Sequence, residues 1–517
     1  MPYPRWSTLL ALVSIPTAIA CTRNPGEGDD EVGETETATE TGTATSETTT
    51  ETGSEPLLGD LQVVLHPNQP MVVDVLVELA VPGYATLTHP DDAGVRVARL
   101  DGEGPATDLH FRVRGLAPAS EHAMELGLGL VEGEPDEVHA VPFTTNPPGP
   151  GYIGAFTLGE NQAELVDDDF RFFDLAPLYV AGAASMFVID PVGRTRWHFG
   201  VELPFVGLDE IWVGIKLRPD GSVLAQHDDA VVVYDELGEQ LLEVTADDLG
   251  VHDFHHDVLE LPSGNFLTFT WSYQDVDYPD DGTLHVAGDR LVEFTPAGEL
   301  VWSWDSFDHL DPQRRRDGFD SLFPIVDPET DEDAKDWTHA NGMLYADGVI
   351  YVSMRHQDWI LAIDHASGDI LWRLGDEGDF ALAPGSTWFF HPHSPQWQPD
   401  GSLLIYDNAV GNPEQPDTDA NSHAARFALD FDAMTATRVW QDDDPAFVSA
   451  LAGDADRTSS GHVLRLDSYY GTNPLASRLR ELDPASTPNA IWSIDLPEGS
   501  FAYRALPLER LVGEAQP

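Results

Sequence analysis

The feature that most constrains the fold is a weak internal repeat, in which a turn containing glycine or aspartate leads into a strand that ends in tryptophan. Five copies keep the tryptophan and a sixth lacks it, at residues 193–197, 298–302, 368–372, 437–440, 489–492 and 238–242. Between them recurs a turn followed by an apolar strand, at residues 219–224, 262–267, 346–350, 399–404 and 459–464. Units of about 45 to 70 residues with several short strands and no helical periodicity are typical of propeller blades. Six units predict an all-β fold with a six-bladed β-propeller over residues 149–517.

A small β-sandwich is predicted ahead of the propeller, over residues 57–148. Short alternating runs are separated there by proline, glycine and aspartate turns, a pattern that favours short antiparallel strands. The passage 113–118, the strand that follows at 122–126 and the closing segment 142–145 resemble a fibronectin type III domain. No cluster of chemically useful residues occurs in this region, so a functional site is expected in the propeller.

The first 56 residues predict export and a tether. Residues 1–20 have the pattern of a signal peptide, with Arg5 at the positive start, an apolar core at 9–15 and small residues at 18–20. Cys21 follows directly and resembles the lipidated residue of a bacterial lipoprotein; an ordinary secretion signal with an incidental cysteine is the alternative. The rest of the segment 21–56 is expected to be a disordered, acidic stalk rich in Thr and Glu. The predicted location is the outer membrane, on its periplasmic or cell-surface side.

The charge of the chain excludes two classes of partner. It carries 90 Asp and Glu against 26 Lys and Arg, which gives a formal net charge of −64 at pH 7. Nucleic acids and anionic membrane surfaces would repel such a protein, so the lipid anchor is the only predicted membrane contact. The single cysteine excludes an intramolecular disulfide and a zinc site built from paired cysteines. A homodimer is an open alternative to a monomer.

Three histidines occur at the same place of three consecutive units. His256, His339 and His393 lie six, seven and six residues before the turn that leads into the apolar strand. The corresponding places in the second and sixth units are near Val213 and Gly453, so histidine is not part of the structural repeat. Because the first strand of each blade lines the central channel, these imidazoles are expected to face one another around the axis. The pattern predicts a functional site rather than three separate structural histidines.

The segments around these histidines resemble one known family, the bacterial PAPS-independent aryl sulfotransferases, or arylsulfate sulfotransferases. The matching segments are His255 to Asn265, Asp336 to Gly342, Val352 to Gln357, and His393 to Gln396 leading to 406–408. The likeness spans most of the propeller and implies an N-terminal β-sandwich followed by a six-bladed propeller. One position departs from the family, because Pro392 stands where the family has Gln before its nucleophilic histidine.

The resemblance also implies roles for individual residues. His393 would take the sulfuryl group of an aryl sulfate ester as a sulfohistidine and pass it to a phenolic acceptor. His256, His339 and Arg355 would surround the sulfuryl oxygens, and Asn341 would add a hydrogen bond. The two small molecules would be the only substrates. No diffusible cofactor and no metal ion are implied.

Several neighbouring residues compete for these roles. His255 and His391 are the alternatives to His256 and His393, and turn spacing disfavours both. Strand alternation predicts that His356, next to Arg355, points away from the site and is structural. The acidic stretch 327–336 lacks the ordered ligand spacing of a calcium loop and is predicted to be a solvated loop.

Two other classes of function stay open. Three histidines on one axis could bind a transition metal and make a metalloenzyme, although the fixed cation of Arg355 suits an oxyanion better than a metal ion. The chain could also be a non-catalytic binding or scaffold lipoprotein, in which case the channel histidines would be dispensable. The tryptophan repeats resemble quinoprotein propellers as well, but no calcium and quinone constellation is evident.

Overall fold

The chain is almost entirely β-structure, as predicted. A computed structural model describes residues 41–42 and 56–515, apart from 179, 205, 207–210, 228, 317–318, 320–324, 413–420, 444–447 and 471–475. The predicted signal peptide, Cys21 and most of the predicted stalk lie outside the described residues. The described helices are single turns: α1 (Ala246–Leu249), α2 (Ser306–His309) and the 3-10 helix η1 (Arg355–Gln357). None of the helices in this part of the chain is long and apolar enough to cross a membrane.

The N-terminal sheet contains seven strands and is built around the long strand β3. The early part of β3 pairs with β2 and β5, and residues 84–88 pair with β6. The buried side chains of Val75, Val113, Leu126 and Val141 lie in one apolar core of this region. The sandwich and its fibronectin type III likeness stay predictions. The strands are β1 (Thr41–Gly42), β2 (Leu58–Leu65), β3 (Val72–Thr88), β4 (Arg96–Arg99), β5 (Ala106–Arg114), β6 (Glu121–Gly129) and β7 (Glu137–Thr144).

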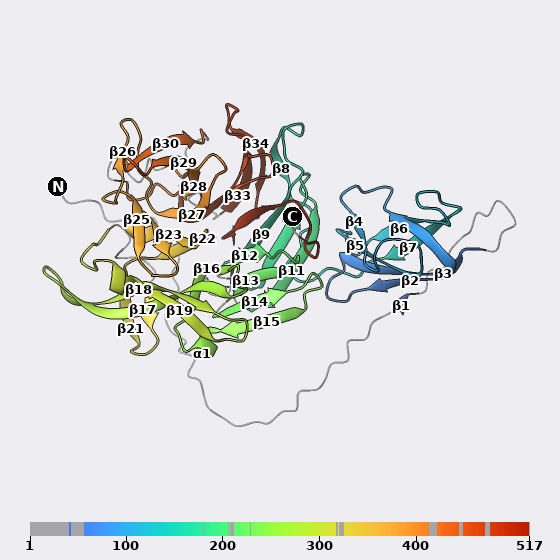
Figure 1. The fold of residues 1–517 in the computed structure, drawn as a ribbon, viewed down its shortest axis with the longest axis horizontal. Helices are drawn as coiled ribbons and strands as arrows, with labels where there is room; N and C mark the ends of the chain where they lie inside the picture. Colours follow the sequence, from blue (N-terminus) through green and yellow to red (C-terminus); the bar gives the residue numbers. More distant parts are fainter. Residues whose placement is uncertain are drawn as a thin grey trace, which may run out of the picture. The chain divides into compact units, whose positions relative to one another are not determined.

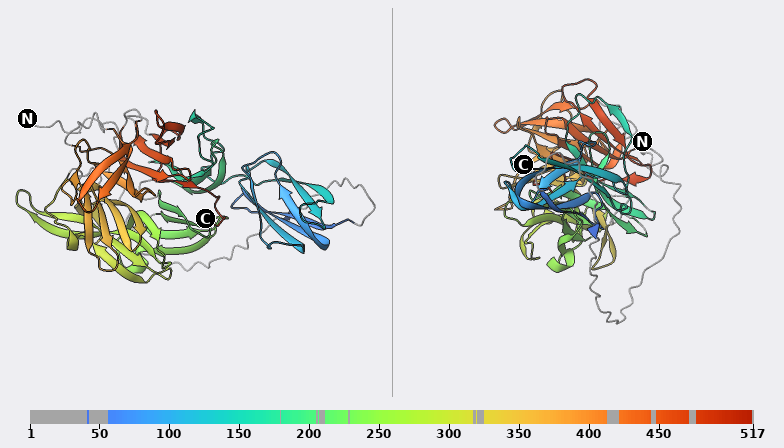
Figure 2. Two further views of the ribbon diagram at one scale, coloured as in Figure 1. Left: turned by 45° about the horizontal axis from the view of Figure 1, so that its top comes forward. Right: turned by 90° about the vertical axis from the view of Figure 1, so that its right-hand side faces the viewer.

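Six further sheets follow one another along the described part of residues 158–508, each built on antiparallel strands that are consecutive in the sequence. In Figure 1 they succeed one another in sequence order, from green through yellow and orange to red, and Figure 2 shows them from two further directions. Their number equals the number of predicted blades, and closure into a six-bladed propeller stays a prediction.

The first three of these sheets contain the following strands. They are β9 (Phe170–Pro177), β10 (Gly182–Ile189) and β11 (Thr195–Leu203); β12 (Trp212–Leu217), β13 (Val223–His227), β14 (Ala230–Tyr234) and β15 (Gln240–Thr245); β16 (Phe254–Glu260), β17 (Phe266–Tyr278), β18 (Gly282–Phe294), β19 (Leu300–Asp305), β20 (Ile325–Asp327) and β21 (Glu332–Asp336).

The last three sheets contain these strands. They are β22 (Ala340–Ala346), β23 (Val349–Met354), β24 (Trp359–Asp364) and β25 (Ile370–Gly375); β26 (Ala381–Leu382), β27 (Pro392–Trp397), β28 (Ser402–Asp407), β29 (His423–Asp430) and β30 (Thr435–Gln441); β31 (Ser449–Arg457), β32 (Val463–Tyr470), β33 (Ala476–Leu482) and β34 (Ala490–Asp495).

The two ends of this region pair with each other's sheets. Strand β8 (Leu158–Asn161) joins β34 of the last sheet, while β35 (Ser500–Phe501) and β36 (Ala505–Leu508) join β9 of the first. This exchange pairs strand edges that would otherwise be open to water or to another chain. It also carries Tyr503 and Arg504, which lie between β35 and β36, into the interior.

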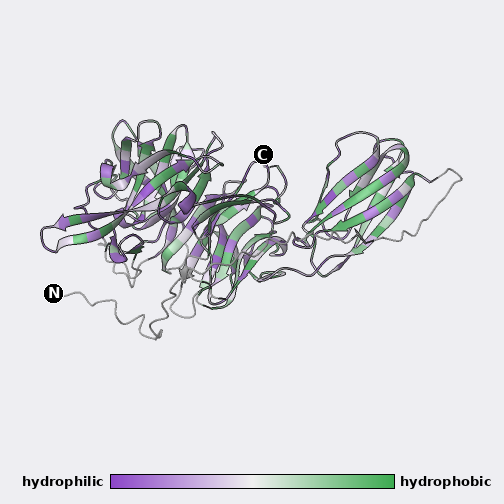
Figure 3. Cartoon of the chain, turned by 90° about the horizontal axis from the view of Figure 1, so that it is seen from below, coloured by the Kyte–Doolittle hydropathy of each residue, from purple (hydrophilic) through white to green (hydrophobic). Residues whose placement is uncertain are grey.

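Two tryptophans of the sequence repeat connect neighbouring sheets. The indole of Trp197 donates to the carbonyl of Glu236 in the next sheet at 3.0 Å, and that of Trp492 donates to Pro191 of the first sheet at 2.8 Å. Hydrophobic and hydrophilic residues alternate along many strands, as Figure 3 shows, so one face of each strand packs against its neighbour. At these two places the repeat therefore encodes contacts between sheets.

Candidate functional site

The three histidines of the sequence pattern occupy corresponding places in the third, fourth and fifth of the six sheets. His256 lies in β16, His339 directly precedes β22, and His393 lies in β27. These three strands contact one another in that order. The imidazole rings of His256 and His339 lie 4.6 Å apart between centroids. His393 is only 1% exposed, and His339 is one of the charges that act on it.

A backbone irregularity aims these side chains. The pairing register shifts between His255 and Val258, between Ala340 and Gly342, and again between His393 and Gln396. The backbone is left-handed close to each shift, with φ of +65° at His256 and +50° at His339. Bulges re-aim side chains at functional sites, and a positive φ in residues other than glycine is a strained conformation that the surrounding structure must hold.

His256, and not His255, faces the other histidines. Its ring lies 5.8 Å from that of Tyr503, and its Nδ1 is 2.9 Å from Nδ1 of His255. His255 instead stacks on Trp271 at 4.0 Å between ring centroids. Burial, together with the neighbouring charges of His339 and His255, lowers the pKa of His256 well below its ordinary value. His256 is therefore a neutral hydrogen-bonding group at neutral pH.

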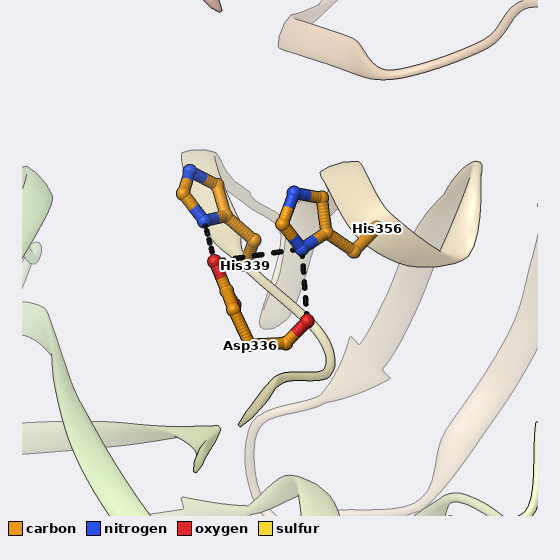
Figure 4. A group of neighbouring side chains, drawn as sticks. All are labelled: Asp336, His339 and His356. Atoms are coloured by element: carbon orange, nitrogen blue, oxygen red, sulfur yellow. Dashed lines mark hydrogen bonds and ion pairs between the residues drawn. The ribbon is translucent and has the colours of Figure 1, made fainter. Parts of the chain in front are cut away.

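Asp336 is a buried partner of two imidazoles, which corrects the prediction of a solvated loop at the end of the stretch 327–336. It is 3% exposed, and its Oδ2 lies 2.5 Å from Nδ1 of His339 and 3.4 Å from Nδ1 of His356. Burial alone would raise the pKa of Asp336, but His339 and His356 hold it well below its ordinary value. Figure 4 shows the Nδ1 atoms of both rings turned toward this carboxylate.

The prediction that His356 points away from the site is wrong. Residues Arg355 to Gln357 form the 3-10 helix η1 and not a strand, so strand alternation does not apply to them. The ring of His356 stacks on that of His339 with centroids 4.5 Å apart, and its Nε2 lies 2.6 Å from Nη1 of Arg355. Nη2 of Arg355 donates to the carbonyl of Ala450 at 2.8 Å.

The imidazole of His393 lies in a cationic environment. Burial lowers the pKa of His393 well below its ordinary value, and the charges of Arg355, Arg504 and His339 lower it further. Asn341 lies beside it, donating from Nδ2 to the carbonyl of Pro392 at 3.1 Å. His393 is therefore a neutral imidazole at neutral pH, with fixed positive charge close by.

Sequence reasoning missed Tyr503 and Arg504. The hydroxyl of Tyr503 and Nη2 of Arg504 both donate to the carbonyl of Asn341, at 3.1 and 2.5 Å. Their backbone N–H groups donate to the carboxylate of Asp174, whose pKa burial raises to about 7. Both residues lie outside the repeat units, and the one signal in the sequence is an arginine within the apolar run 501–508.

The site contains a group of side chains with the spacing of a metal site. Ligand atoms of Asp336, His339 and His356 lie within 4.8 Å of one another. However, Arg355 can only donate to Nε2 of His356, which places the proton of that ring on Nδ1, the atom that would have to bind the metal. A neutral histidine binds a metal through an unprotonated nitrogen, so this donor set does not fit a metal ion.

A comparison with protein families decides the relationship of this chain. Residues 159–504 match the arylsulfotransferase (ASST) family. The chain belongs to the arylsulfotransferase family. Membership supports aryl sulfotransferase activity and implies an aryl sulfate and a phenol as small-molecule substrates. No curated protein matches the chain.

Three solved structures that are similar to this member of the family are distant from it. A point mutant of the Synechocystis apocarotenoid oxygenase is 11% identical, with a TM-score of 0.33, and covers 70% of this chain and 97% of its own. The hydrazine synthase of Kuenenia stuttgartiensis is 12% identical, with a TM-score of 0.29. The match covers 59% of this chain and 68% of the synthase chain. Apo AztD from Citrobacter koseri is 9% identical, with a TM-score of 0.27. The match covers 74% of this chain and 95% of the AztD chain. Similarity at this level carries no argument about function.

Proposed function

We propose that this chain moves a sulfuryl group from an aryl sulfate ester to a phenol, without PAPS, through a sulfohistidine on His393. The observation that carries the proposal is the setting of His393, a buried imidazole on which the positive charges of Arg355 and Arg504 act. A neutral imidazole is a competent nucleophile, and fixed cations stabilise the negative charge that develops on the sulfuryl oxygens.

The reaction takes two displacements. In the first, a ring nitrogen of His393 attacks sulfur, the N–S bond forms, and the bond from sulfur to the aryl oxygen breaks with its electron pair leaving on the phenolate. In the second, the oxygen of the acceptor phenol attacks sulfur and the N–S bond breaks, which restores the imidazole. No electron is gained or lost, and the only other transfer is that of one proton.

His339 is the group placed to carry that proton. Its Nδ1 is held by Asp336, so its other nitrogen points away from the carboxylate. The protonated ring gives its proton to the leaving phenolate, and the neutral ring takes a proton from the acceptor phenol. The ring is therefore an imidazolium before the first displacement and again after the second. Burial lowers the pKa of His339, and the carboxylate of Asp336 opposes this by stabilising the imidazolium. His256, Arg355 and Asn341 would hold the sulfuryl oxygens.

The test is sulfuryl exchange between 4-nitrophenyl sulfate and phenol. The wild-type protein should release 4-nitrophenolate and form phenyl sulfate, and incubation with donor alone should add one SO3 group to the peptide that contains His393. His393→Ala should lose both results. His365→Ala is the matched control, because His365 pairs with Glu293 outside the site. Absence of transfer by the wild type across a panel of aryl sulfates would reject the proposal.

Export and lipid anchoring at Cys21 are proposed as well, on the sequence pattern alone. Expression of the full chain in a bacterial host should place it in the outer-membrane fraction, and Cys21→Ala should release it into the soluble periplasmic fraction. Equal fractionation of the two proteins would contradict the anchor.

A further inference from the structure

We infer that His356 is the positioning residue of the Arg355 guanidinium, and that Asp336 fixes the tautomer in which His356 does so. The inference rests on the proposed function and deepens it. His356 is adjacent in the sequence to Arg355, a predicted site residue. His356 itself has no predicted contact with the sulfuryl group.

Both hydrogen-bond partners of the His356 ring have fixed roles, which determine the nitrogen that carries the proton. Nε2 lies 2.6 Å from Nη1 of Arg355, and a guanidinium can only donate. Nδ1 lies 3.0 Å from the backbone carbonyl of Asp336, and a carbonyl can only accept. Both contacts are satisfied by one tautomer, with the proton on Nδ1 and the lone pair on Nε2.

The ring of His356 is held in one orientation by its surroundings. His356 is 2% exposed and stacks against His339 at an interplanar angle of 29°. The carboxylate of Asp336 lies at Nδ1 of both rings, as Figure 4 shows, so one acidic group orients two imidazoles at once. Rotation of the His356 ring would break the contacts at Nδ1 and Nε2 together. The ring therefore holds its acceptor nitrogen at a fixed place.

Two acceptors from different parts of the chain hold the guanidinium of Arg355. Its Nη1 is held by His356, which lies in the same 3-10 helix, and its Nη2 by the carbonyl of Ala450, which lies in the sixth sheet. Two acceptors at different nitrogens set the plane of a guanidinium as well as its position. Arg355 is also the charge that most strongly affects His393. A misplaced guanidinium would weaken transition-state stabilisation at the sulfuryl group, and displacement by about 1 Å can cost about 100-fold in rate.

Two matched variants distinguish the contact that His356 makes at Nε2 from the contact that it makes at Nδ1. In His356→Gln the side-chain amide reaches the place of Nε2 and keeps an acceptor for Arg355. In His356→Asn the amide reaches only the place of Nδ1, so the contact with Asp336 is kept and the acceptor for Arg355 is lost. We expect kcat/KM for 4-nitrophenyl sulfate to fall about 10- to 100-fold in His356→Asn and less than about 5-fold in His356→Gln. Equal losses in both variants would overturn the inference.

A double-mutant cycle tests whether His356 acts through Arg355. In the Arg355→Ala background, measured at high enzyme concentration, His356→Asn should change kcat/KM by no more than about 2-fold, since the group it positions is absent. A loss as large as in the wild-type background would show that His356 acts on its own and would overturn the inference. His365→Asn serves as the control histidine and should leave kcat/KM unchanged in both backgrounds.

A second readout does not depend on activity. Nitrogen-15 NMR of histidine-labelled protein should show Nδ1 of His356 protonated and Nε2 unprotonated. Arg355→Ala should shift the Nε2 signal of His356 more than it shifts the signal of any unprotonated histidine nitrogen outside the site. A proton on Nε2 in the wild type would overturn the inference. If the wild type transfers no sulfuryl group, the proposed function fails, while the NMR measurement still decides whether His356 holds Arg355.

Discussion

The guanidinium of Arg504 donates a hydrogen bond to the backbone carbonyl of Asn341, 163 residues earlier in the chain. Arg504 lies in the segment that returns to the first of the six sheets, between β35 and β36, and Asn341 lies in the fourth sheet. Chain closure thus places a buried cation beside the predicted site, where it also lowers the pKa of His393. The return of the chain to the first of the six sheets and the electrostatics of the site share this residue.

Replacement of Arg504 should therefore affect both properties. Arg504→Gln keeps a donor but removes the charge, so we expect kcat for sulfuryl transfer to fall about 10- to 100-fold and the free energy of unfolding to fall by about 1 to 3 kcal/mol. Steady-state kinetics and urea unfolding measure the two effects. Arg504→Lys, which keeps a cation, should recover part of the rate. An unchanged kcat in Arg504→Gln would show that this charge does not act on the reaction.

Acidification should spare the nucleophile over the ordinary histidine range. The pKa of His393 is lowered well below 6.5, so the ring stays neutral when the pH falls from 7 to 6. With 4-nitrophenyl sulfate, whose leaving group needs no proton, the rate of sulfohistidine formation should be flat across this interval and fall only in more acidic solution. Single-turnover release of 4-nitrophenolate measures this rate. A midpoint near 6.5 would contradict the burial argument.

Asp174 should make stability depend on pH in the opposite sense to an ordinary carboxylate. Burial raises its pKa from 3.8 to about 7, so the folded state keeps the proton that the unfolded state loses. Its contribution to stability is present below pH 3.8 and is lost as the pH rises toward 7, by up to about 1.4 kcal/mol per pH unit. Asp174→Asn should therefore gain stability relative to wild type between pH 5 and pH 7 in urea unfolding. A constant difference between the two proteins would contradict this pKa.

Trp492 should matter for stability and little for chemistry. Its buried indole joins the last sheet to the first through the hydrogen bond to Pro191. Trp492→Ala should lower the free energy of unfolding by about 3 to 5 kcal/mol. At a temperature where the variant is folded, its kcat should stay within about 2-fold of the wild type. A large loss of kcat without a loss of stability would contradict a purely structural role.

Salt should not weaken the reaction. The chain has a formal net charge of −64, and a sulfate ester is an anion, so long-range attraction cannot guide the donor to the site. Screening at 0.15 M salt acts over about 8 Å, which reduces this repulsion. We expect kcat/KM to rise or hold as salt is added at constant pH. A steep fall would indicate that long-range attraction brings the donor to the site.

Part of the site follows from the sequence because the repeat is local. A turn followed by a strand sets a phase that can be counted, and the count selected His256, His339 and His393. It also marked Val213 and Gly453, where the same register shift occurs without a histidine, between Val213 and Lys216 and between Ser449 and Ala452. The bulge therefore belongs to the repeated fold, and the histidines are additions to it.

The errors arose where local alternation ends. The periodicity of a strand predicts an outward side chain at His356, but the chain turns there into a 3-10 helix. The composition of its neighbours predicts that Asp336 lies in a solvated loop, but its carboxylate is buried and contacts two histidines. Composition describes a segment and cannot identify the one member of it that has a buried partner.

The sequence by itself determined that the chain is all-β, that its units repeat, and that three histidines share one phase, since each of these depends on residues a few positions apart. Only the tertiary structure decided the pairing of Asp336 with two imidazoles, the support of Arg355 by His356, and the arrival of Arg504 beside His393. Those contacts depend on bulges, on one helical turn and on chain closure. Each is stabilised by long-range packing and hydrogen bonding, which local periodicity does not encode.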